Sequence, residues 1–370
     1  MMGSLLKETD SYPLTETVSP PRIIQKSQII SSLPTIEVWG KAAIGEYLWK
    51  HILGGELTDK DNSWYSYGSL NVNNISFIFR SGPGVAPNTV PQNVQFLVLV
   101  INGRSESKIS AAKIWLDSLP SFRYLRNVIL VVLGDEKCDN DWLLPYMKSR
   151  GGKVNAAFLV YDSPLVDNRE FFQWPLGVAT YRGFPNLQDE DIDLLSSRPY
   201  LCNFLGTVYK NSSRETLIET IKLNNLEDEC LILGRPKWSP LETKLTLGRY
   251  ISSIHKSDLT LNPVGMNTEC YRIYESLSLG SIPVVEDVVT TGNCDRNNFQ
   301  SPLRLLKDHG APLIFIKNWS DLPLLLSEER MLTLEEKVQR RIFAMQWYKN
   351  FKTTMRDILI ETIYKVLEMK

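Results

Sequence analysis

Residues 257–287 place an arginine and a glutamate three positions apart behind a glycine turn. Arg272 and Glu275 should share one face of a helix, because residues at this spacing are neighbours on a helix surface. A short apolar strand and a turn at Gly265 precede that helix, and Thr268 is a candidate N-cap. The first amides of a helix and a planar guanidinium both attract phosphate. We therefore expect Arg272 to contact a diphosphate and Glu275 to accept hydrogen bonds from a ribose, although such a pair alone is most often an exposed ion pair.

The elements that would position these residues alternate between strand and helix. Continuous apolar runs, such as residues 94–101, are typical of strands that are buried on both faces of a parallel sheet. The alternation predicts an α/β protein with two doubly wound, Rossmann-like domains, whose strands end at a crevice. We expect strands at 74–79, 94–101, 128–133, 156–161, 200–206, 229–233, 259–261, 282–285 and 313–316. We expect helices at 37–52, 107–118, 142–148, 213–222, 244–253 and, with a break, 334–369.

Composition sets limits on the class of protein. With 370 residues and 43% hydrophobic content, the chain can fill two domain cores. Its 41 basic and 42 acidic residues produce no overall field toward nucleic acid, so we expect no nucleic-acid partner. The five cysteines include no closely spaced pair, which argues against structural zinc. Buried free thiols are the first expectation, and one or two disulfides are the alternative.

Several motifs resemble known transferases. The segment SDLTLNPVGMNTECYRIYESLSLGSIPVVED resembles the nucleotide-binding signature of exostosin-type glycosyltransferases, although Asn262 and Glu269 depart from the common pattern. More narrowly, NTECYRIYE, SIPVVEDV, GAPLIFIKNW and VWGKAAIGEYLW resemble the ribitol-phosphate xylosyltransferase family. That resemblance extends from about Pro34 to the last helix. It implies a GT-B fold, with a long C-terminal helix that braces the first domain.

The resemblance also implies a reaction and a donor site. The expected reaction is inverting transfer of xylose from UDP-xylose to ribitol-5-phosphate, in β-1,4 linkage, on the O-mannosyl glycan of α-dystroglycan. Gly265, Asn267 and Thr268 would join Arg272 and Glu275 at the donor. The stretch FLGTVYKNSSRETL is similar to a second conserved element of exostosin-type domains, which makes Gly206 and Arg214 a further phosphate cradle; the alternative is a surface arginine beside a helix cap.

An inverting transferase needs a general base beside the acceptor hydroxyl. Our first candidate is Asp135, which follows an expected strand of the first domain; Asp162 and His255 are alternatives. We expect no metal, because arginine and a helix terminus can neutralise the leaving diphosphate. The acceptor phosphate would need a basic partner, for which we consider Arg104 and Arg182.

The expected organisation has four parts. Residues 1–33 would be a flexible stem, 34–190 the acceptor-side domain, 191–345 the UDP-sugar domain and 346–370 the C-terminal helix. No stretch reaches the roughly 18 apolar residues of a membrane span. The resembling family is Golgi-resident and anchored by one N-terminal helix, so we expect a form that begins beyond this anchor.

Two alternatives to xylosyl transfer stay open. One is an exostosin-type glucuronyl or N-acetylglucosaminyl transferase, which would use the same diphosphate site. The other is a GT-B-shaped scaffold without catalysis, which would bind other enzymes of the same glycan pathway. Binding of UDP separates an enzyme from a scaffold that has lost its site, and a panel of UDP-sugars separates the two transferases.

Overall fold

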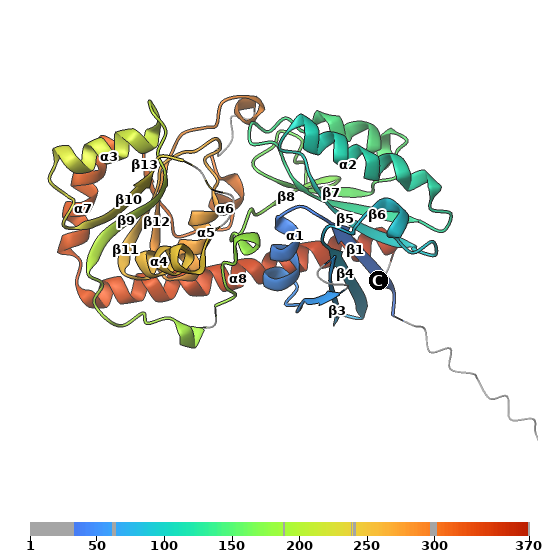
Figure 1. Ribbon diagram of the computed structural model, residues 1–370, viewed down its shortest axis with the longest axis horizontal. Helices are drawn as coiled ribbons and strands as arrows, with labels where there is room; N and C mark the ends of the chain where they lie inside the picture. Colours follow the sequence, from blue (N-terminus) through green and yellow to red (C-terminus); the bar gives the residue numbers. More distant parts are fainter. Residues whose placement is uncertain are drawn as a thin grey trace, which may run out of the picture. The chain divides into compact units, whose positions relative to one another are not determined.

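The computed structural model describes residues 33–60, 64–187, 189–237, 239, 242–296 and 302–368. The expected stem therefore lies outside the described residues, except for its last position. In these ranges no helix combines the length and the apolar character that a membrane crossing requires. Residues 34–370 form one compact unit that contains two sheets (Figure 1).

The first sheet has eight strands in the order β2-β3-β4-β1-β5-β6-β7-β8. Neighbouring strands run parallel from β4 to β8, and β2 and β3 extend one edge in antiparallel fashion. β5, β6 and β7 are buried almost throughout, as their continuous apolar runs predict. The bounds are β1 Thr35–Gly40, β2 Thr58–Lys60, β3 Tyr65–Val72, β4 Ile75–Ser81, β5 Phe96–Asn102, β6 Asn127–Leu133, β7 Ala156–Val160 and β8 Phe171–Trp174.

Short helices complete this first lobe. Helix α1 runs directly into a π-helical turn. The helix predicted at 142–148 is a 3-10 helix that begins one residue earlier and ends two residues earlier. The strands expected at 94–101, 128–133 and 156–161 and the helix expected at 107–118 are confirmed within two residues. The α-helices are α1 Ile44–Tyr47 and α2 Glu106–Ser118; the π-helical turn is Leu48–Ile52; the 3-10 helices are Pro87–Thr89, Leu119–Ser121, Asp141–Tyr146, Lys148–Arg150, Thr180–Arg182 and Asp189–Asp191.

The helix predicted over residues 37–52 is wrong in its first part. Residues Thr35–Gly40 form β1, which lies between β4 and β5 at the centre of the sheet. All but the first residue of this strand are buried, because a strand lies on each side of it and the rest of the lobe covers both faces of the sheet. Val38 and Ala42 fit a helical spacing by coincidence, since each is buried for a different reason.

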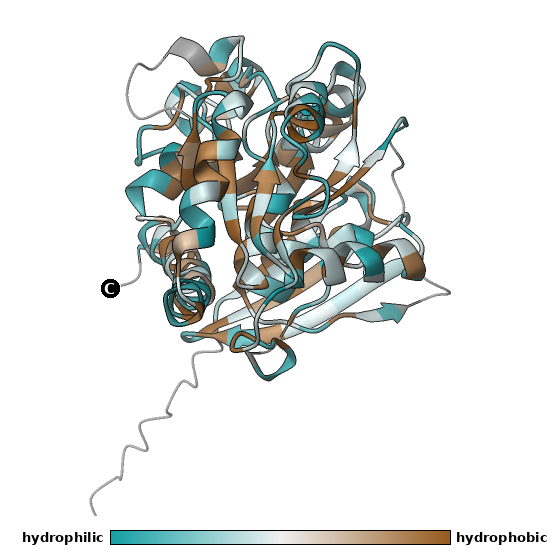
Figure 2. Cartoon of the chain, turned by 90° about the vertical axis from the view of Figure 1, so that its left-hand side faces the viewer, coloured by the Kyte–Doolittle hydropathy of each residue, from teal (hydrophilic) through white to brown (hydrophobic). Residues whose placement is uncertain are grey.

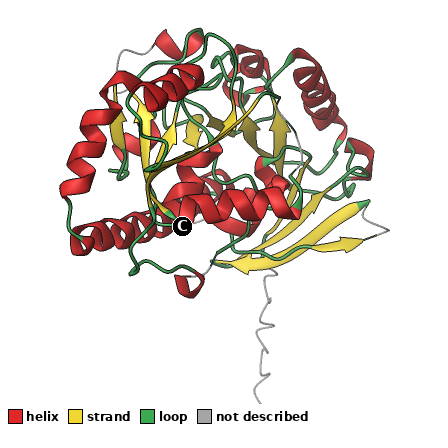
Figure 3. Ribbon diagram, turned by 60° about the vertical axis from the view of Figure 1, so that its left-hand side comes forward, coloured by secondary structure: helices red, strands yellow, loops and turns green. Residues whose placement is uncertain are grey.

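The second sheet has five parallel strands in the order β10-β9-β11-β12-β13, and helices surround it (Figure 3). Its predicted strands are all confirmed. The strands are β9 Tyr200–Thr207, β10 Cys230–Arg235, β11 Ser257–Asn262, β12 Ile282–Glu286 and β13 Ile314–Ile316. The helices are α3 Ser213–Leu223, α4 Lys244–His255, α5 Tyr271–Ser278, α6 Arg304–Asp308 and α7 Leu322–Met331, with 3-10 helices at Asn293–Arg296 and Trp319–Asp321.

Helix α8, Leu334–Leu367, is continuous over 34 residues, so the predicted break is wrong. A capping box between Thr333 and Glu336 begins it. The boundary that we expected between the UDP-sugar domain and the C-terminal helix, at residues 345/346, falls inside this helix. Near the middle of the helix, the hydroxyl of Tyr348 lies 3.2 Å from the hydroxyl of Tyr47, and near its C-terminal end Tyr364 donates to the carbonyl of Asn73. The helix therefore contacts both lobes, and it braces the first lobe as the resemblance implies (Figure 1).

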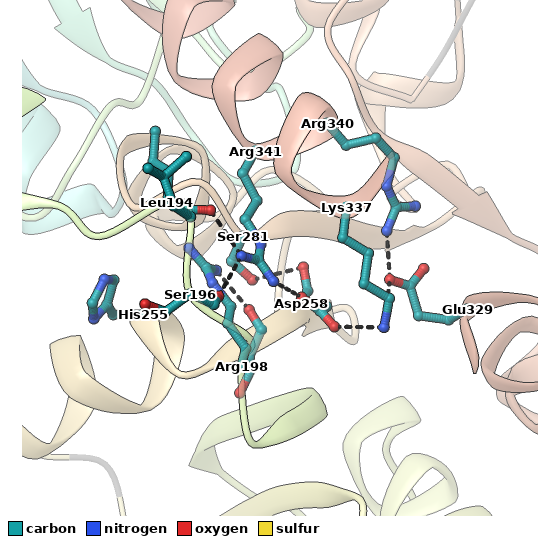
Figure 4. A network of polar contacts seen from close by, with 12 residues as sticks. Leu194, Ser196, Arg198, His255, Asp258, Ser281, Glu329, Lys337, Arg340 and Arg341 are labelled. Atoms are coloured by element: carbon teal, nitrogen blue, oxygen red, sulfur yellow. Dashed lines mark hydrogen bonds and ion pairs between the residues drawn. The ribbon is translucent and has the colours of Figure 1, made fainter. Parts of the chain in front are cut away.

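A buried ion-pair cluster attaches the start of α8 to the second sheet (Figure 4). Asp258 of β11 accepts from Arg341 at 2.6 Å and from Lys337 at 2.9 Å. Glu329 of α7 accepts from Arg340. Arg341 also donates to the carbonyls of Leu194 and Ser196, at 2.8 Å each. The charges of this cluster are therefore compensated within the protein. We refer to it below as the Asp258 cluster.

Apolar side chains fill both lobes. The larger group of buried residues runs through the two sheets, α5 and α8, and a smaller group fills the space between the first sheet and α2. In Figure 2 the strands are mostly brown, and much of the helix surface is teal. The two lobes thus share part of one core through α5 and α8.

The expectation of free thiols is wrong for four of the five cysteines. Cys202 and Cys230 are register partners on β9 and β10, with Cα atoms 4.5 Å apart, and they form a disulfide. Cys138 and Cys294 form a second disulfide that joins the first lobe to the second. Sequence spacing did not indicate these pairs, because each depends on strand or loop contacts. Cys270 keeps a free thiol.

Candidate active site

A pocket of about 550 Å³ lies between the two lobes. Its walls are the loops that follow β5 and β6, the connector after β8, the ends of β9 and β10, helix α4 and residues 265–275. The carboxyl ends of parallel strands thus face the crevice, as in other doubly wound sheets. Six arginines and four glutamates line the pocket, with no lysine or aspartate, so its formal charge favours an anionic ligand.

Helix α5 begins two residues later than predicted. Its first residue is Tyr271 and its N-cap is Cys270, whereas Thr268 was expected to cap it. The amide of Thr268 donates to Thr290, and its hydroxyl donates to the carbonyl of Val288. Thr268 thus fixes the 265–270 loop on the 288–290 loop and does not line the main pocket. The predicted end of the helix is confirmed, since Gly280 adopts a left-handed φ of 67° just after it.

Arg272 lies in the first turn of α5 and points into the pocket. Its Nη2 donates to the carbonyl of Leu205 at 2.9 Å, and its guanidinium lies 4.9 Å from the centre of the Phe204 ring. Its Nε and Nη1 are buried and have no hydrogen-bond partner. Within the described residues no carboxylate forms an ion pair with it. Buried donors without partners are costly, so this guanidinium is suited to an anionic ligand.

Arg214, near the start of α3, is the second cation of this wall. Its Nη1 donates to the carbonyl of Thr207 at 2.9 Å, and its Nε is buried without a partner. Burial, and then repulsion from Arg272, lower the pKa of Arg214. The two arginines are close enough to repel each other, and in the described part of the chain no carboxylate forms an ion pair with either, so together they form a site for more than one negative charge.

Gly206 and Gly265 leave room for these two arginines. A Cβ at position 206 would lie 2.9 Å from Nη2 of Arg272, and one at position 265 would lie 2.7 Å from Nη2 of Arg214. Any side chain would therefore displace a guanidinium. The structure brings together four of the predicted residues, Arg272, Arg214, Gly206 and Gly265, on one wall of the pocket.

Glu275 also lines the pocket, but its carboxylate is already engaged. It accepts from the amide of Ala179 at 3.0 Å and from the hydroxyl of Tyr250. Burial raises its pKa. Glu275 therefore connects α5 to the connector between the lobes, and its predicted contact with a ribose stays a prediction.

Glu269 is a pocket residue that the sequence did not indicate. Its carboxylate accepts from the amide of Leu176 at 2.9 Å and from the hydroxyl of Tyr274. Burial raises its pKa to about 7, despite these hydrogen bonds. In the sequence, Glu269 stands out only as a departure from the exostosin pattern. Together with Glu275, it joins the second lobe to the backbone that links the lobes.

Asp135, our first candidate for the general base, does not line the pocket. Its carboxylate accepts from the amide of Lys137 at 2.7 Å and thereby closes a turn. The next residue, Glu136, lines the pocket in its place and forms an ion pair with Arg104. Glu136 thus reaches the pocket from the loop that carries Asp135, and the role of Asp135 as the general base stays a prediction.

The other candidate bases also lie elsewhere. Asp162 forms an ion pair with Arg304 at 2.9 Å. His255, at the end of α4, contacts the carbonyl of Asp193 and is remote from the pocket. Both have structural partners in the described part of the chain.

Asn267 lines the pocket, but its side chain joins the lobes. Its Nδ2 donates to the carbonyl of Glu136 at 2.8 Å, and its Oδ1 accepts from the amide of Glu269 at 2.8 Å. The two basic residues considered for an acceptor phosphate, Arg104 and Arg182, both line the pocket. Arg182 donates to the carbonyl of Ser239. A direct contact between Asn267 and the donor stays a prediction.

Aromatic rings cover the rest of the pocket wall. Tyr181 and Tyr271 lie 5.8 Å apart between ring centres, and Tyr161, Tyr250 and Phe184 are also at the surface of the cavity. Such rings pack on the apolar faces of sugars and bases. The described residues hold no cluster of three or more potential metal ligands.

Comparison with known proteins identifies the family. Two family models, described as the RXYLT1 N-terminal domain and the RXYLT1 C-terminal domain, match residues 36–175 and 181–367. Ribitol-5-phosphate xylosyltransferase 1 of Danio rerio is 49% identical over 340 residues, which cover 90% of this chain and 78% of the relative. The Homo sapiens protein of the same name is 46% identical over 341 residues, which cover 90% and 77%.

Solved structures show weaker similarity. The catalytic domain of Starch Synthase IV from Arabidopsis thaliana bound to ADP and acarbose has a TM-score of 0.42 at 10% identity, over 88% of this chain and 100% of that one. An alpha1,3-fucosyltransferase has a TM-score of 0.40 at 11% identity, over 95% and 93%. The assignment rests on the family models and the curated relatives. The chain belongs to the ribitol-5-phosphate xylosyltransferase 1 family.

Proposed function

We propose that this chain is an inverting glycosyltransferase that moves xylose from UDP-xylose to ribitol-5-phosphate in β-1,4 linkage. Membership of the family supports the reaction, because its curated relatives are named for it. The biological acceptor in this proposal is the O-mannosyl glycan of α-dystroglycan, and the compartment is the Golgi. Other enzymes of the same glycan pathway are further proposed partners.

One observation carries the donor part of the proposal. Arg272 and Arg214 face the pocket with buried N–H groups that have no partner. A diphosphate, which carries two or more negative charges, would supply acceptor oxygens to both arginines. The glycines at 206 and 265 leave room for these two guanidinium groups beside the backbone. Transfer leaves negative charge on UDP, and these fixed cations would stabilise that charge as it develops.

The proposed chemistry uses the protein's own groups. The acceptor hydroxyl attacks C1 of xylose from the face opposite UDP, the C1–O bond to the β-phosphate breaks, and its electron pair leaves with UDP. The hydroxyl proton passes to a carboxylate. We propose that no metal is required, because the two arginines supply the positive charge that a metal would otherwise bring.

A donor and acceptor panel tests the proposal. The full chain is incubated with UDP-xylose, UDP-glucuronic acid or UDP-N-acetylglucosamine and with a ribitol-5-phosphate glycan, and products are measured by mass spectrometry. We expect a pentose added only with UDP-xylose, with or without EDTA. Addition of another sugar would support the exostosin-type alternative, and UDP binding without any transfer would contradict the enzymatic assignment.

A further inference from the structure

We propose that the Arg104–Glu136 ion pair is the acceptor site of the first lobe, with Glu136 as the general base and Arg104 as the ligand of the acceptor phosphate. This inference rests on the proposed function and assigns residues to its acceptor half. It places the acceptor opposite Arg272 and Arg214.

The position of the pair supports an acceptor role. Arg104 follows β5 and Glu136 follows β6, and these strands are parallel neighbours, with Asn102 paired to Leu133 at their carboxyl ends. Both side chains line the pocket and form an ion pair across the two loops. The remaining charged residue on this side, Arg182 in the connector, reaches toward Ser239 and Glu242 of the second lobe. Arg104 and Glu136 are therefore the charged side chains that the loops after β5 and β6 present to the pocket.

The loop that carries Glu136 is held against the second lobe at several points. The carbonyl of Glu136 accepts at 2.8 Å from Asn267, which lies two residues after Gly265. The carbonyl of Lys137 accepts from the amide of Asn293 at 2.8 Å. The disulfide between Cys138 and Cys294 adds a covalent link. These contacts fix the backbone of the loop that carries Glu136 relative to the proposed donor site, and a base acting on the acceptor hydroxyl requires such positioning.

The other carboxylates of the pocket have structural partners that limit their use as a base. Glu269 and Glu275 each accept from a backbone amide of the connector and from a tyrosine hydroxyl. Glu242 accepts from Arg235 at 2.9 Å. Among the described residues, the carboxylate of Glu136 has Arg104 as its one polar partner, and 26% of its side chain is exposed. It therefore has lone pairs available for a hydroxyl.

Arg104 can serve the acceptor phosphate while it orients Glu136. A guanidinium has five N–H donors in a planar fork, and the ion pair uses Nη2. Its side chain is 32% exposed, so other donors can reach a ligand. In the proposed step, Glu136 takes the proton of the attacking hydroxyl as the new C1–O bond forms. UDP leaves with the electron pair of the broken bond, and Glu136 then returns the proton to solvent.

Kinetics of paired variants test the assignment. Glu136→Gln should lower kcat for xylosyl transfer by roughly 100-fold or more, the usual contribution of a general base, while the Kd for UDP changes by less than about twofold. Formate should restore part of kcat in Glu136→Ala. Arg104→Gln should raise KM for the ribitol-5-phosphate acceptor by roughly tenfold or more. The matched control is Glu229→Gln, which removes the exposed ion pair with Arg330, remote from the pocket.

Three outcomes decide between the alternatives. Glu136→Gln with kcat within about threefold of wild type would overturn the inference and leave the proposed function intact. A large loss of kcat in Glu269→Gln, with UDP affinity unchanged and Glu136→Gln active, would move the base to Glu269. Wild-type chain that binds UDP but transfers xylose to no ribitol-phosphate acceptor would contradict the proposed function itself.

Discussion

The Asp258 cluster and one wall of the pocket both bury guanidinium groups, but they differ in what compensates the charge. This wall consists of Gly206, Arg214, Gly265 and Arg272; we call it the donor wall because we propose that it binds the donor. In the cluster, Arg341 is 1% exposed and forms an ion pair with Asp258. In the pocket, Arg272 is 9% exposed and donates to a carbonyl, that of Leu205. A charge that the fold compensates is structural, whereas one that the fold leaves without an acid is available to a ligand.

The same contrast applies to the neighbours of each arginine. Lys337 and Arg340 reach the carboxylates of Asp258 and Glu329, so cations and anions alternate (Figure 4). Arg214 and Arg272 instead repel each other. Such uncompensated repulsion disfavours the empty site and would be relieved by a diphosphate.

The largest effect should come from breaking the compensated region. Asp258→Asn leaves Arg341 buried without its anion and should lower the free energy of unfolding by about 3 kcal/mol or more. Urea unfolding followed by circular dichroism measures the change. Glu229→Gln breaks an exposed ion pair and should cost less than about 1 kcal/mol. Equal losses in the two variants would show that burial of the cluster contributes nothing special.

The pH dependence of stability should reveal Glu269, the buried acid between the lobes. Burial raises its pKa from 4.5 to about 7. The folded state therefore binds the proton more tightly than the unfolded state, and this contribution to the unfolding free energy is lost as pH rises from about 4.5 to about 7. Glu269→Gln should remove the contribution, which is at most about 3 kcal/mol. Urea midpoints at pH 5 and pH 8 measure it; an unchanged difference between the two pH values in the variant would exclude this role.

The smallest effect on stability should come from the donor wall. Arg272→Gln removes the contacts with Leu205 and Phe204, but it also removes a buried charge that has no counter-ion. These contributions oppose each other, so we expect the unfolding free energy to stay within about 1 kcal/mol of wild type. A loss comparable with that of Asp258→Asn would show that Arg272 is a structural residue like Arg341.

The sequence predicted the parts of the molecule that depend on short segments. The strand at 94–101 and the donor wall around Gly265 and Arg272 were found because a strand, a turn and a helix are consecutive in the chain. The segment Thr35–Gly40 was misassigned because its burial depends on β4 and β5, which come later in the chain. Local patterns cannot report such pairing.

Side chains that connect the lobes were also beyond local patterns. Glu269 and its partner Leu176 are 93 positions apart, and the disulfide between Cys138 and Cys294 spans 156 positions. Asp135 and Glu136 show that the sequence can locate a loop at the pocket without identifying the side chain that reaches the pocket. The strand end was located, but adjacent residues of a turn point in different directions, and only the three-dimensional structure shows which one reaches the pocket.

The most direct test of the central claim is calorimetric titration of UDP into wild-type chain and Arg272→Gln. We expect saturable binding of one UDP per wild-type chain and an affinity at least about tenfold lower in the variant, because charge-assisted hydrogen bonds to the diphosphate are lost. Equal UDP affinity in the two proteins, with both folded, would contradict the assignment of the uncompensated arginines to the donor.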